Sequence, residues 1–492
     1  MKVVILDIPT TPVFVTPEFV NISKELKKYR LYTQKIKLEE KFKIKFPPPN
    51  SYNRGLLFIA SILENKGFKV EYYNSDYDKN FWHKCKDRIG KTDFLLASAK
   101  TNNYPIVLNL LKKAKEINGR VKTIIGGSHP TALPDECLKE KAVDYVIMGE
   151  GEETIEELFD FILNKKRKLD NIAGLAFKKD GKIHINKWRP LISDLDTLPM
   201  PAYHLLPGGL KSYHPYIDTS RGCPYRCGFC SGPSFWRRKI RTRSLENFYE
   251  ELLLIKSLIG GYNFLHISDP ILGVTERQKE ILKQLENKNH NLWFSCDIKA
   301  NYVKETLIKT MMNCGIRVFS VGIETLNDNS LKIIRKNCSA KLEIEACKLI
   351  KKFKNSFIKS YWIVGLPGEN KESLKYNNEQ IHDLLKSEII DQVCNHILVP
   401  YPGTEIFNNP EKFGINILHK KWEHYEGRSY PPVYELDNLS NQDIYNYFLQ
   451  ALNNELSFYK EKYSKLADIP EDKSSQRDED AISFAEYKGR LV

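Results

Sequence analysis

The stretch TSRGCPYRCGFCSGPSFW, residues 219–236, decides how the chain is interpreted, because it holds three cysteines within a span of eight residues. Cys223, Cys227 and Cys230 have the spacing C-x3-C-x2-C. They follow the segment YIDTS (216–220), which is predicted to be a strand, so the thiols are expected in a loop at its carboxyl end. In a chain for which we expect no secretory leader, such thiols indicate metal ligands or redox groups rather than disulfides.

Three kinds of site can use closely spaced thiols. Structural zinc normally closes its site with four ligands, and the nearest histidines, His204 and His214, lie upstream and unpaired. A redox pair needs only two thiols, so the third would be surplus. An iron–sulfur cluster held by three thiolates leaves one iron open, which is useful only if another molecule binds there.

The length, net charge and apolar stretches of the chain limit the number of domains, the kind of partner and the location that can be expected. A chain of 492 residues is expected to form two or three domains. A net charge of +13 permits an anionic partner, but the lysines are spread through amphipathic segments, so nucleic acid is not the expected partner. The apolar start is cut off by Pro9, and no later stretch approaches eighteen uncharged apolar residues, so we expect a cytoplasmic protein without a membrane span.

Strand and helix patterns alternate along the first part of the chain, which predicts a parallel sheet covered on both faces. A Pro-flanked, Lys/Glu-rich insertion at residues 10–50 interrupts them, either as a helical insertion or as a mobile flap. The alternating segment 171–187 predicts a hairpin around Asp180-Gly181. The strands are predicted at 2–8, 68–73, 92–98, 121–127 and 144–150, with helices at 53–66, 104–118 and 151–162.

A second alternation begins at Tyr216 and gives about six strand–helix repeats, typical of a partial parallel barrel with its chemistry at the carboxyl ends of the strands. The last regular segment, residues 441–463, is predicted to be one helix, and the charged end 470–492 to be only partly ordered.

The motif CPYRCGFC, with Phe229 before the last cysteine, resembles that of the radical S-adenosylmethionine superfamily. The resemblance implies a 4Fe-4S cluster whose open iron is chelated by S-adenosylmethionine, which one electron cleaves to a 5'-deoxyadenosyl radical. The segments VGIETLNDNSLKIIRK, WIVGLPGE and LVPYPGTEIF resemble later strand ends of that family. HISDP offers one acid where the family often has two, and Lys299 replaces a common Arg. The implied S-adenosylmethionine contacts are Phe229, Asp269, Glu324, Ile363, Gly365 and Glu369.

An alternating α/β domain before such a barrel, with IIGGSHPTALPDE and DYVIMGEGEETI, resembles the cobalamin-binding members of the superfamily. The D-x-H-x-x-G motif is missing, so the resemblance implies cobalamin without that histidine ligand, and His129 is expected to be a turn residue instead. Strand ends with glycines let a bulky ligand approach the backbone. The candidate cobalamin residues are Asp7, Ser98, Thr101, Gly126, Gly127, Gly149, Glu150 and Gly151.

The expected fold is α/β: a doubly wound, Rossmann-like cobalamin-binding domain, a partial (β/α)6 radical S-adenosylmethionine barrel and a helical C-terminal tail. The expected boundaries are 1–165 for the cobalamin domain, 166–212 for the hairpin and linker, 213–405 for the barrel and 406–492 for the C-terminal region.

The leading functional hypothesis is methylation of an unactivated carbon, or of phosphorus, in a small-molecule or peptide substrate, with flavodoxin or ferredoxin as the implied electron donor. The alternatives are a non-methylating cyclisation, rearrangement or oxidation with the same cofactors, and, from another class, a cobalamin or iron–sulfur carrier or an RNA-binding protein.

Overall fold

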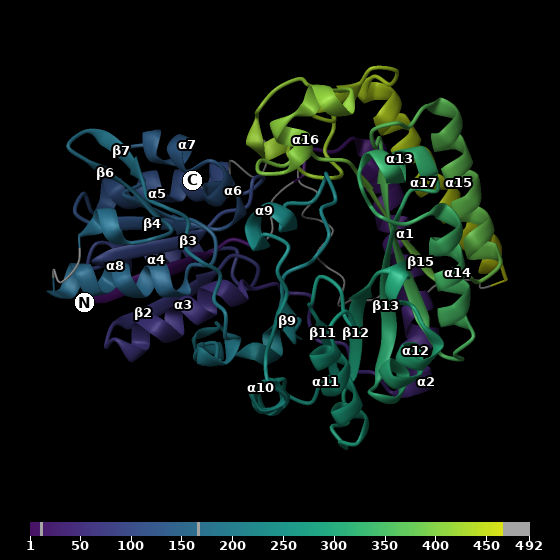
Figure 1. Cartoon of the computed structure of the whole chain (residues 1–492), viewed down its shortest axis with the longest axis horizontal. Coiled ribbons are helices and arrows are strands. Elements are labelled where there is room, and N and C mark those ends of the chain that lie inside the picture. Colours follow the sequence, from purple (N-terminus) through teal and green to yellow (C-terminus); the bar gives the residue numbers. More distant parts are fainter. Residues whose placement is uncertain (10–12, 165–167, 466–492) are drawn as a thin grey trace.

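A computed structural model describes residues 1–9, 13–164 and 168–465. Two sheets form its two halves, with the early part of the chain at the left of Figure 1 and the later part at the right. The predicted charged end, 470–492, lies outside the described residues.

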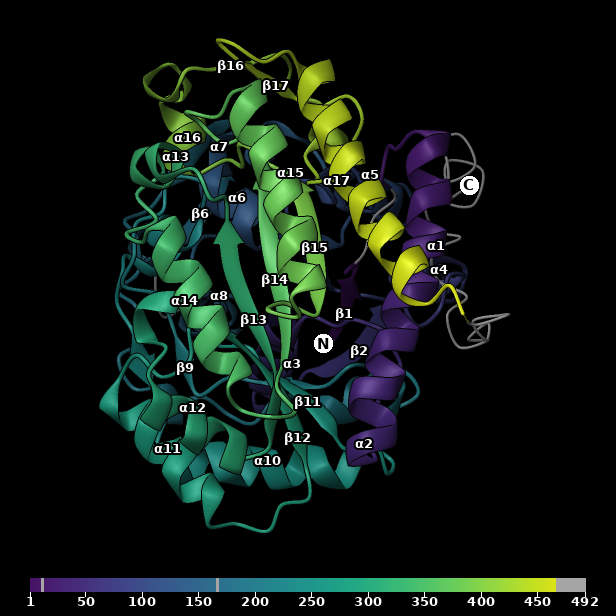
Figure 2. The ribbon, with the colours of Figure 1, turned by 90° about the vertical axis from the view of Figure 1, so that its right-hand side faces the viewer.

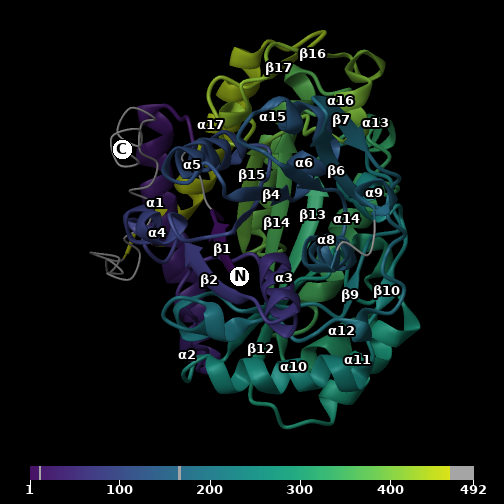
Figure 3. The ribbon, with the colours of Figure 1, turned by 90° about the vertical axis from the view of Figure 1, so that its left-hand side faces the viewer.

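The first sheet has seven strands in the order β2-β1-β3-β4-β5-β6-β7. The first five are parallel, and the predicted hairpin is present as β6 and β7, which extend this sheet in antiparallel fashion. Helix α3 packs beside α8 and α4 beside α5, on the two faces seen in Figures 1 and 3. The bounds are β1 Lys2–Asp7, α3 Arg54–Asn65, β2 Lys69–Asn74, α4 Phe81–Ile89, β3 Phe94–Ser98, α5 Tyr104–Ile117, β4 Lys122–Gly126, α6 Ser128–Ala132, α7 Pro134–Lys139, β5 Tyr145–Ile147, α8 Glu152–Asn164, β6 Leu175–Lys179 and β7 Lys182–Ile185.

The second sheet is a six-stranded, all-parallel partial barrel in the order β15-β14-β13-β12-β11-β8. Its helices begin at caps that the sequence supplies, such as Ser244 and Thr275, whose side chains accept hydrogen bonds from backbone N–H groups. The bounds are β8 Tyr216–Ile217, β9 Ser220–Arg221, α9 Gly232–Trp236, β10 Arg241–Thr242, α10 Leu245–Leu258, β11 Phe264–Ile267, α11 Glu276–Glu286, β12 Trp293–Ile298, α12 Glu305–Asn313, β13 Ile316–Glu324, α13 Asp328–Ile333, α14 Ala340–Lys351, β14 Phe357–Val364, α15 Lys371–Lys386 and β15 Gln392–Ile397.

The insertion at residues 10–50 packs against the second half of the chain. Its helix α1 (Pro17–Gln34) lies along the last helix, α17 (Asn441–Lys462), as Figure 2 shows. Below it, Leu38 and Ile44 pack against Phe264, Val318 and Phe357 at the starts of barrel strands. Because these contacts bury apolar side chains against the barrel, the described part of the insertion is a strap around the barrel rather than a flap over the first sheet.

Short elements complete the C-terminal region. They are α16 Glu405–Asn408, β16 Ile415–Ile417 and β17 Tyr434–Leu436. Within the described residues no helix is long and apolar enough to cross a membrane.

Candidate active site

The loop that carries the three cysteines is anchored at its start by a buried carboxylate. Asp269 accepts hydrogen bonds from the backbone N–H of Thr219 at 2.6 Å, from the Ser220 hydroxyl at 2.7 Å and from Gln278 Nε2 at 2.7 Å. It is fully buried and lines neither of the cavities described below. The Asp269 carboxylate therefore positions the strand end that leads into the cysteine loop, and its contact with S-adenosylmethionine stays a prediction.

The loop also depends on one glycine. Gly222 has φ +107°, a conformation that residues with a side chain rarely adopt. A Cβ at this position would lie 1.9 Å from the backbone oxygen of Lys239, which comes just before the strand β10 that pairs with β9. The chain can therefore pass this close to the Lys239 backbone only with glycine here.

All three thiols line one cavity of about 710 Å³ within the barrel, together with Phe229. Burial raises the pKa of the Cys223 and Cys227 thiols, while Lys299 and Lys336 act in the opposite direction. Three thiols beside two ammonium groups suit an anionic iron–sulfur cluster, for which Cys223, Cys227 and Cys230 would be the ligands. Nowhere in the described chain do three or more His, Cys, Asp or Glu side chains close around a single metal ion.

Glu324 also lines this thiol cavity, at the end of β13. Its φ of +66° and a register shift between β13 and β14 turn it out of the regular strand. Lys336 donates a 2.6 Å hydrogen bond to Glu324 Oε1, and Lys299 donates to the backbone oxygen of Lys336 at 2.6 Å. Sequence reasoning missed Lys336, because nothing in the pattern RKNC marks that lysine as buried. Glu324 and Ile363 line the cavity as expected for S-adenosylmethionine contacts, and they remain candidates for that role.

Two predicted contacts after β14 do not line the thiol cavity. Gly365 has φ +81° and packs under the hydroxyl of Tyr434, which donates to its backbone oxygen at 2.7 Å. Glu369 is buried and accepts hydrogen bonds from the backbone N–H groups of Gly365 and Leu366, both at 2.9 Å. These residues fix the loop that follows Ile363, and their contact with S-adenosylmethionine stays a prediction.

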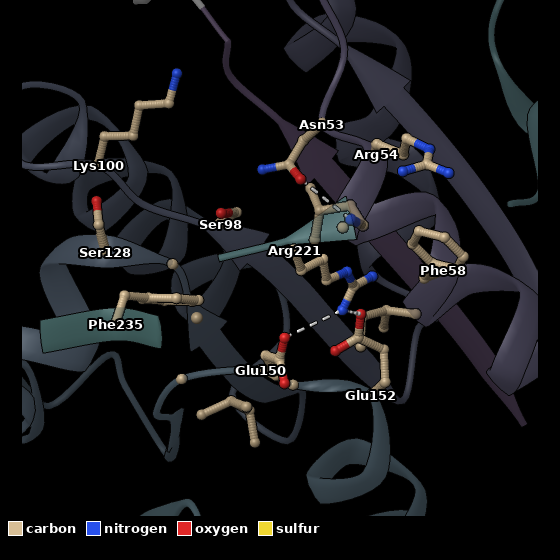
Figure 4. Close-up of a pocket in the computed structure, with 18 of the residues that line it drawn as sticks. Asn53, Arg54, Phe58, Ser98, Lys100, Ser128, Glu150, Glu152, Arg221 and Phe235 are labelled. Atoms are coloured by element: carbon tan, nitrogen blue, oxygen red, sulfur yellow. Dashed lines mark hydrogen bonds and ion pairs between the residues drawn. The ribbon is translucent and has the colours of Figure 1, made fainter. Parts of the chain in front are cut away.

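A second cavity, of about 520 Å³, lies between the two halves at the carboxyl ends of β3, β4 and β5 (Figure 4). Apolar side chains such as Phe58 and Leu96 form part of its wall. Asn53, Lys100 and Ser128 supply polar groups (Figure 4). The barrel contributes Arg221 and Phe235. The predicted cobalamin residues that line it are Ser98, Gly126, Gly127, Gly149, Glu150 and Gly151.

An ion-pair cluster crosses this interdomain cavity (Figure 4). Arg221 Nη1 lies 2.8 Å from Glu152 Oε1 and 3.6 Å from Glu150 Oε1, and Arg241 Nη1 lies 2.7 Å from Glu150 Oε2. Glu150 Oε1 is buried and has no hydrogen-bond partner among the described residues. An unsatisfied acceptor in the wall of a cavity is costly unless a ligand donates to it.

Two predicted cobalamin residues lie elsewhere. Asp7 is buried and accepts hydrogen bonds from the Asn53 backbone N–H at 2.8 Å and from the Tyr72 hydroxyl at 2.6 Å, so it holds the start of α3 instead of lining the cavity. Thr101 is also buried away from the cavity. Gly127 is explained by close backbone packing, since a Cβ there would lie 2.6 Å from the Ala99 oxygen.

The donor set of the interdomain cavity suits cobalamin, which has an apolar ring with amide side chains around its edge. Apolar walls can take the ring, and the partly exposed polar side chains of Asn53, Ser98 and Ser128 can pair with the amides. The described lining contains no histidine. His129 is fully buried instead, stacked on Tyr104 with ring centroids 4.2 Å apart.

Comparisons with known proteins match the two halves of the chain to two different family models. Residues 48–159 match the family model of the B12 binding domain, and residues 217–377 match the Radical SAM superfamily. An uncharacterized methyltransferase of Pyrococcus horikoshii is 30% identical over 82% of this chain and 87% of its own length. The chain belongs to the cobalamin-binding radical S-adenosylmethionine family. The fold and the cofactor set predicted from the sequence, a 4Fe-4S cluster, S-adenosylmethionine and cobalamin, are thereby confirmed.

Other similar proteins carry different names. Cytidylyl-2-hydroxyethylphosphonate methyltransferase of Streptomyces wedmorensis is 27% identical over 65% of this chain and 70% of that protein. An anaerobic magnesium-protoporphyrin IX monomethyl ester cyclase of Synechocystis is 26% identical over 75% of each. The fold is shared with the radical S-adenosylmethionine methyltransferase TsrM of Kitasatospora setae, at a TM-score of 0.64 and 15% identity over 87% of this chain and 85% of that one.

Proposed function

We propose that this protein methylates an unactivated carbon, or phosphorus, of a small-molecule or peptide substrate. The observation that carries the proposal is the direct adjacency of two cavities, one lined by the three thiols and one by the cobalamin-domain strand ends, which share wall residues. When bound, the cluster and S-adenosylmethionine supply a radical that removes a hydrogen atom, and cobalamin supplies a methyl group.

The residues of the chain would bind the cofactors, orient the reacting groups and enclose the two cavities. Cys223, Cys227 and Cys230 would hold the cluster, and the Glu324 carboxylate would accept hydrogen bonds from the S-adenosylmethionine amino or ribose groups. Ser98, Ser128 and Glu150 would bond the periphery of cobalamin. Side chains from both halves enclose the cavities and keep water from the reacting groups. A reductant such as flavodoxin or ferredoxin would supply the electron.

The names of the relatives support methylation first and cyclisation second. Two of the three relatives described above are named as methyltransferases, and one as a cyclase. We therefore retain a non-methylating cyclisation with the same cofactors as the second candidate.

The test is to incubate the reconstituted protein, dithionite and S-adenosylmethionine carrying a CD3 group with metabolites from cells that lack the gene. A product that gains the labelled methyl group, with formation of 5'-deoxyadenosine, is the expected result. Deoxyadenosine together with an unlabelled, altered product would favour cyclisation. A purified protein that retained no corrinoid and formed no deoxyadenosine would contradict both.

A further inference from the structure

The thiol cavity and the interdomain cavity meet at a short wall. Gly232, Trp236 and Pro270 line both of them. Two of these residues come from α9, which follows the cysteine motif and lies between the two sheets in Figure 1. Pro270 follows Asp269, whose buried hydrogen bonds fix this side of the wall. A molecule that passed directly from one cavity to the other would have to cross these three residues.

Trp236 is the bulky member of the wall and stands next to a cluster ligand. The position that a Cβ of Gly232 would take lies 3.4 Å from Cε3 of Trp236 and 3.3 Å from Cys230 Sγ. The Gly232 backbone N–H also donates to Cys230 Sγ at 3.3 Å. The indole ring and the thiol therefore both border the side of Gly232 that carries no side chain, and the ring of Phe235 packs edge-on against the indole with ring centroids 5.7 Å apart.

We propose that Trp236 is a partition that keeps the radical-generating site apart from cobalt until a substrate lies between them. The proposal rests on the proposed use of both cofactors and adds a role for this chain's own residue. Trp236 would act as a positioning residue, because its bulk excludes a direct path and leaves substrate as the only acceptor within reach of the radical.

Removing the partition has a defined chemical consequence. One electron from the dithionite-reduced cluster breaks the C–S bond of S-adenosylmethionine and gives methionine and the 5'-deoxyadenosyl radical. Without a barrier, the unpaired electron of this radical pairs with that of cob(II)alamin, and one Co–C bond forms, giving adenosylcobalamin. No proton and no further oxidant is needed, so the reaction requires no knowledge of the natural substrate.

The experiment uses the full chain reconstituted with cluster and cobalamin, in the dark, with S-adenosylmethionine and dithionite but without substrate. We expect Trp236→Ala to form photolabile adenosylcobalamin about tenfold faster than wild type, whereas Trp236→Phe, which keeps a ring, stays near wild type. Trp82→Ala is the matched control, because it removes an indole ring from helix α4, which lines neither cavity. Equal rates in Trp236→Ala and wild type, or an equal increase in Trp82→Ala, would overturn the partition.

Two further measurements show whether a negative result comes from loss of a cofactor or contradicts the role of Trp236. The EPR spectrum of the reduced cluster and the amount of cobalamin retained after gel filtration show whether each variant still holds both groups. If Trp236→Ala loses either one, Trp236→Leu takes its place with the same expectation. Wild-type protein that holds no cobalamin, or that forms no deoxyadenosine, would contradict the proposed function itself, whereas normal cofactor loading with unchanged adenosylcobalamin formation contradicts only the partition.

Discussion

Glu324 combines a strained backbone with a paired charge in the wall of the thiol cavity. A positive φ in a residue with a side chain costs free energy and persists only where its surroundings fix it. Here the strand irregularity and the 2.6 Å bond from Lys336 do so. The carboxylate is thus held in place in the wall of the cavity that the three thiols also line.

Replacing Glu324 by Gln should raise the KM for S-adenosylmethionine about tenfold, because a charge-assisted hydrogen bond is lost while the shape is kept. The measurement is the rate of 5'-deoxyadenosine formation against S-adenosylmethionine concentration. Glu388→Gln is the control, since Glu388 also has a positive φ, of 55°, but lies at the surface, beside Lys462. An unchanged KM in Glu324→Gln would argue against the proposed contact.

Glu369 should make the stability of the protein depend on pH. Burial raises the pKa of Glu369 to about 7, and the hydrogen bonds from Thr325, Leu366, Gly365 and Asn377 oppose this only in part. Between about pH 4.5 and 7 the folded chain holds a proton that the unfolded chain has lost, so the free energy of unfolding falls as pH rises through this range.

The predicted decrease is on the order of 2 kcal/mol and should be absent in Glu369→Gln. Thermal midpoints of wild type and variant, measured from pH 5.5 to 8, check it. The wild-type midpoint should fall more steeply with rising pH than that of the variant. Parallel curves would contradict the assignment.

His129 is expected to take no part in binding cobalt. It is fully buried, its ring stacks on Tyr104 and meets the edge of Trp422, and burial lowers its pKa to about 4. His129→Asn should leave the EPR spectrum of bound cob(II)alamin unchanged, while lowering the thermal midpoint. Loss of nitrogen hyperfine splitting in the variant would show that His129 is a cobalt ligand after all.

At the scale of elements, the cysteine loop is built from a strand end, a glycine turn and the short helix α9. Gly222→Ala should abolish cluster incorporation, because its Cβ would collide with the Lys239 backbone, whereas strain from φ alone costs only about 1–3 kcal/mol. Gly181→Ala provides the comparison: Gly181 has φ +74° in the β6–β7 hairpin, and nothing lies within 4 Å of its added Cβ. Iron content and the visible absorbance of reconstituted protein distinguish the two variants.

The sequence predicted the strands and helices of both sheets well, because apolar periodicity and capping residues are local signals. It was less informative about which polar residues at strand ends face a cavity. Asp269 and Glu369 were assigned as ligand contacts, yet both anchor loops, since a buried carboxylate at a strand end serves either purpose. The pairing of Arg221 with Glu152 depends on segments far apart in the chain, and no local signal marks Lys336 as the buried partner of Glu324, 12 residues before it.

For the whole molecule, a buried ionic network joins the two halves. Arg54 of α3 pairs with Glu251 of α10 at 2.7 Å and with Asp218, and Arg243 pairs with Glu251 at 2.6 Å. Despite burial, which acts in the opposite direction, Arg54 and Arg243 hold the pKa of Glu251 below its usual value. Arg54 and Asp218 of this network also line the interdomain cavity, so the shape of that cavity depends on it.

Arg54→Ala should lower the free energy of unfolding by about 3 kcal/mol, because it leaves buried carboxylates short of a partner. Lys66→Ala, just beyond the other end of α3, breaks a more exposed pair with Asp160 and should cost less than about 1 kcal/mol. Denaturant titrations of both variants provide the measurement. Equal losses would show that the interdomain network contributes no more than a surface ion pair.

The pairing of α1 with α17 has a consequence for synthesis. The apolar side chains Phe19, Ile22 and Leu26 leave the ribosome early, but the helix that covers them, joined through Arg30 and Glu455, is made roughly 400 residues later. At about 5–20 residues per second that delay is on the order of a minute. During this time the apolar face of α1 lacks the helix that covers it, so the newborn chain depends on chaperones or on provisional contacts until its last helix emerges.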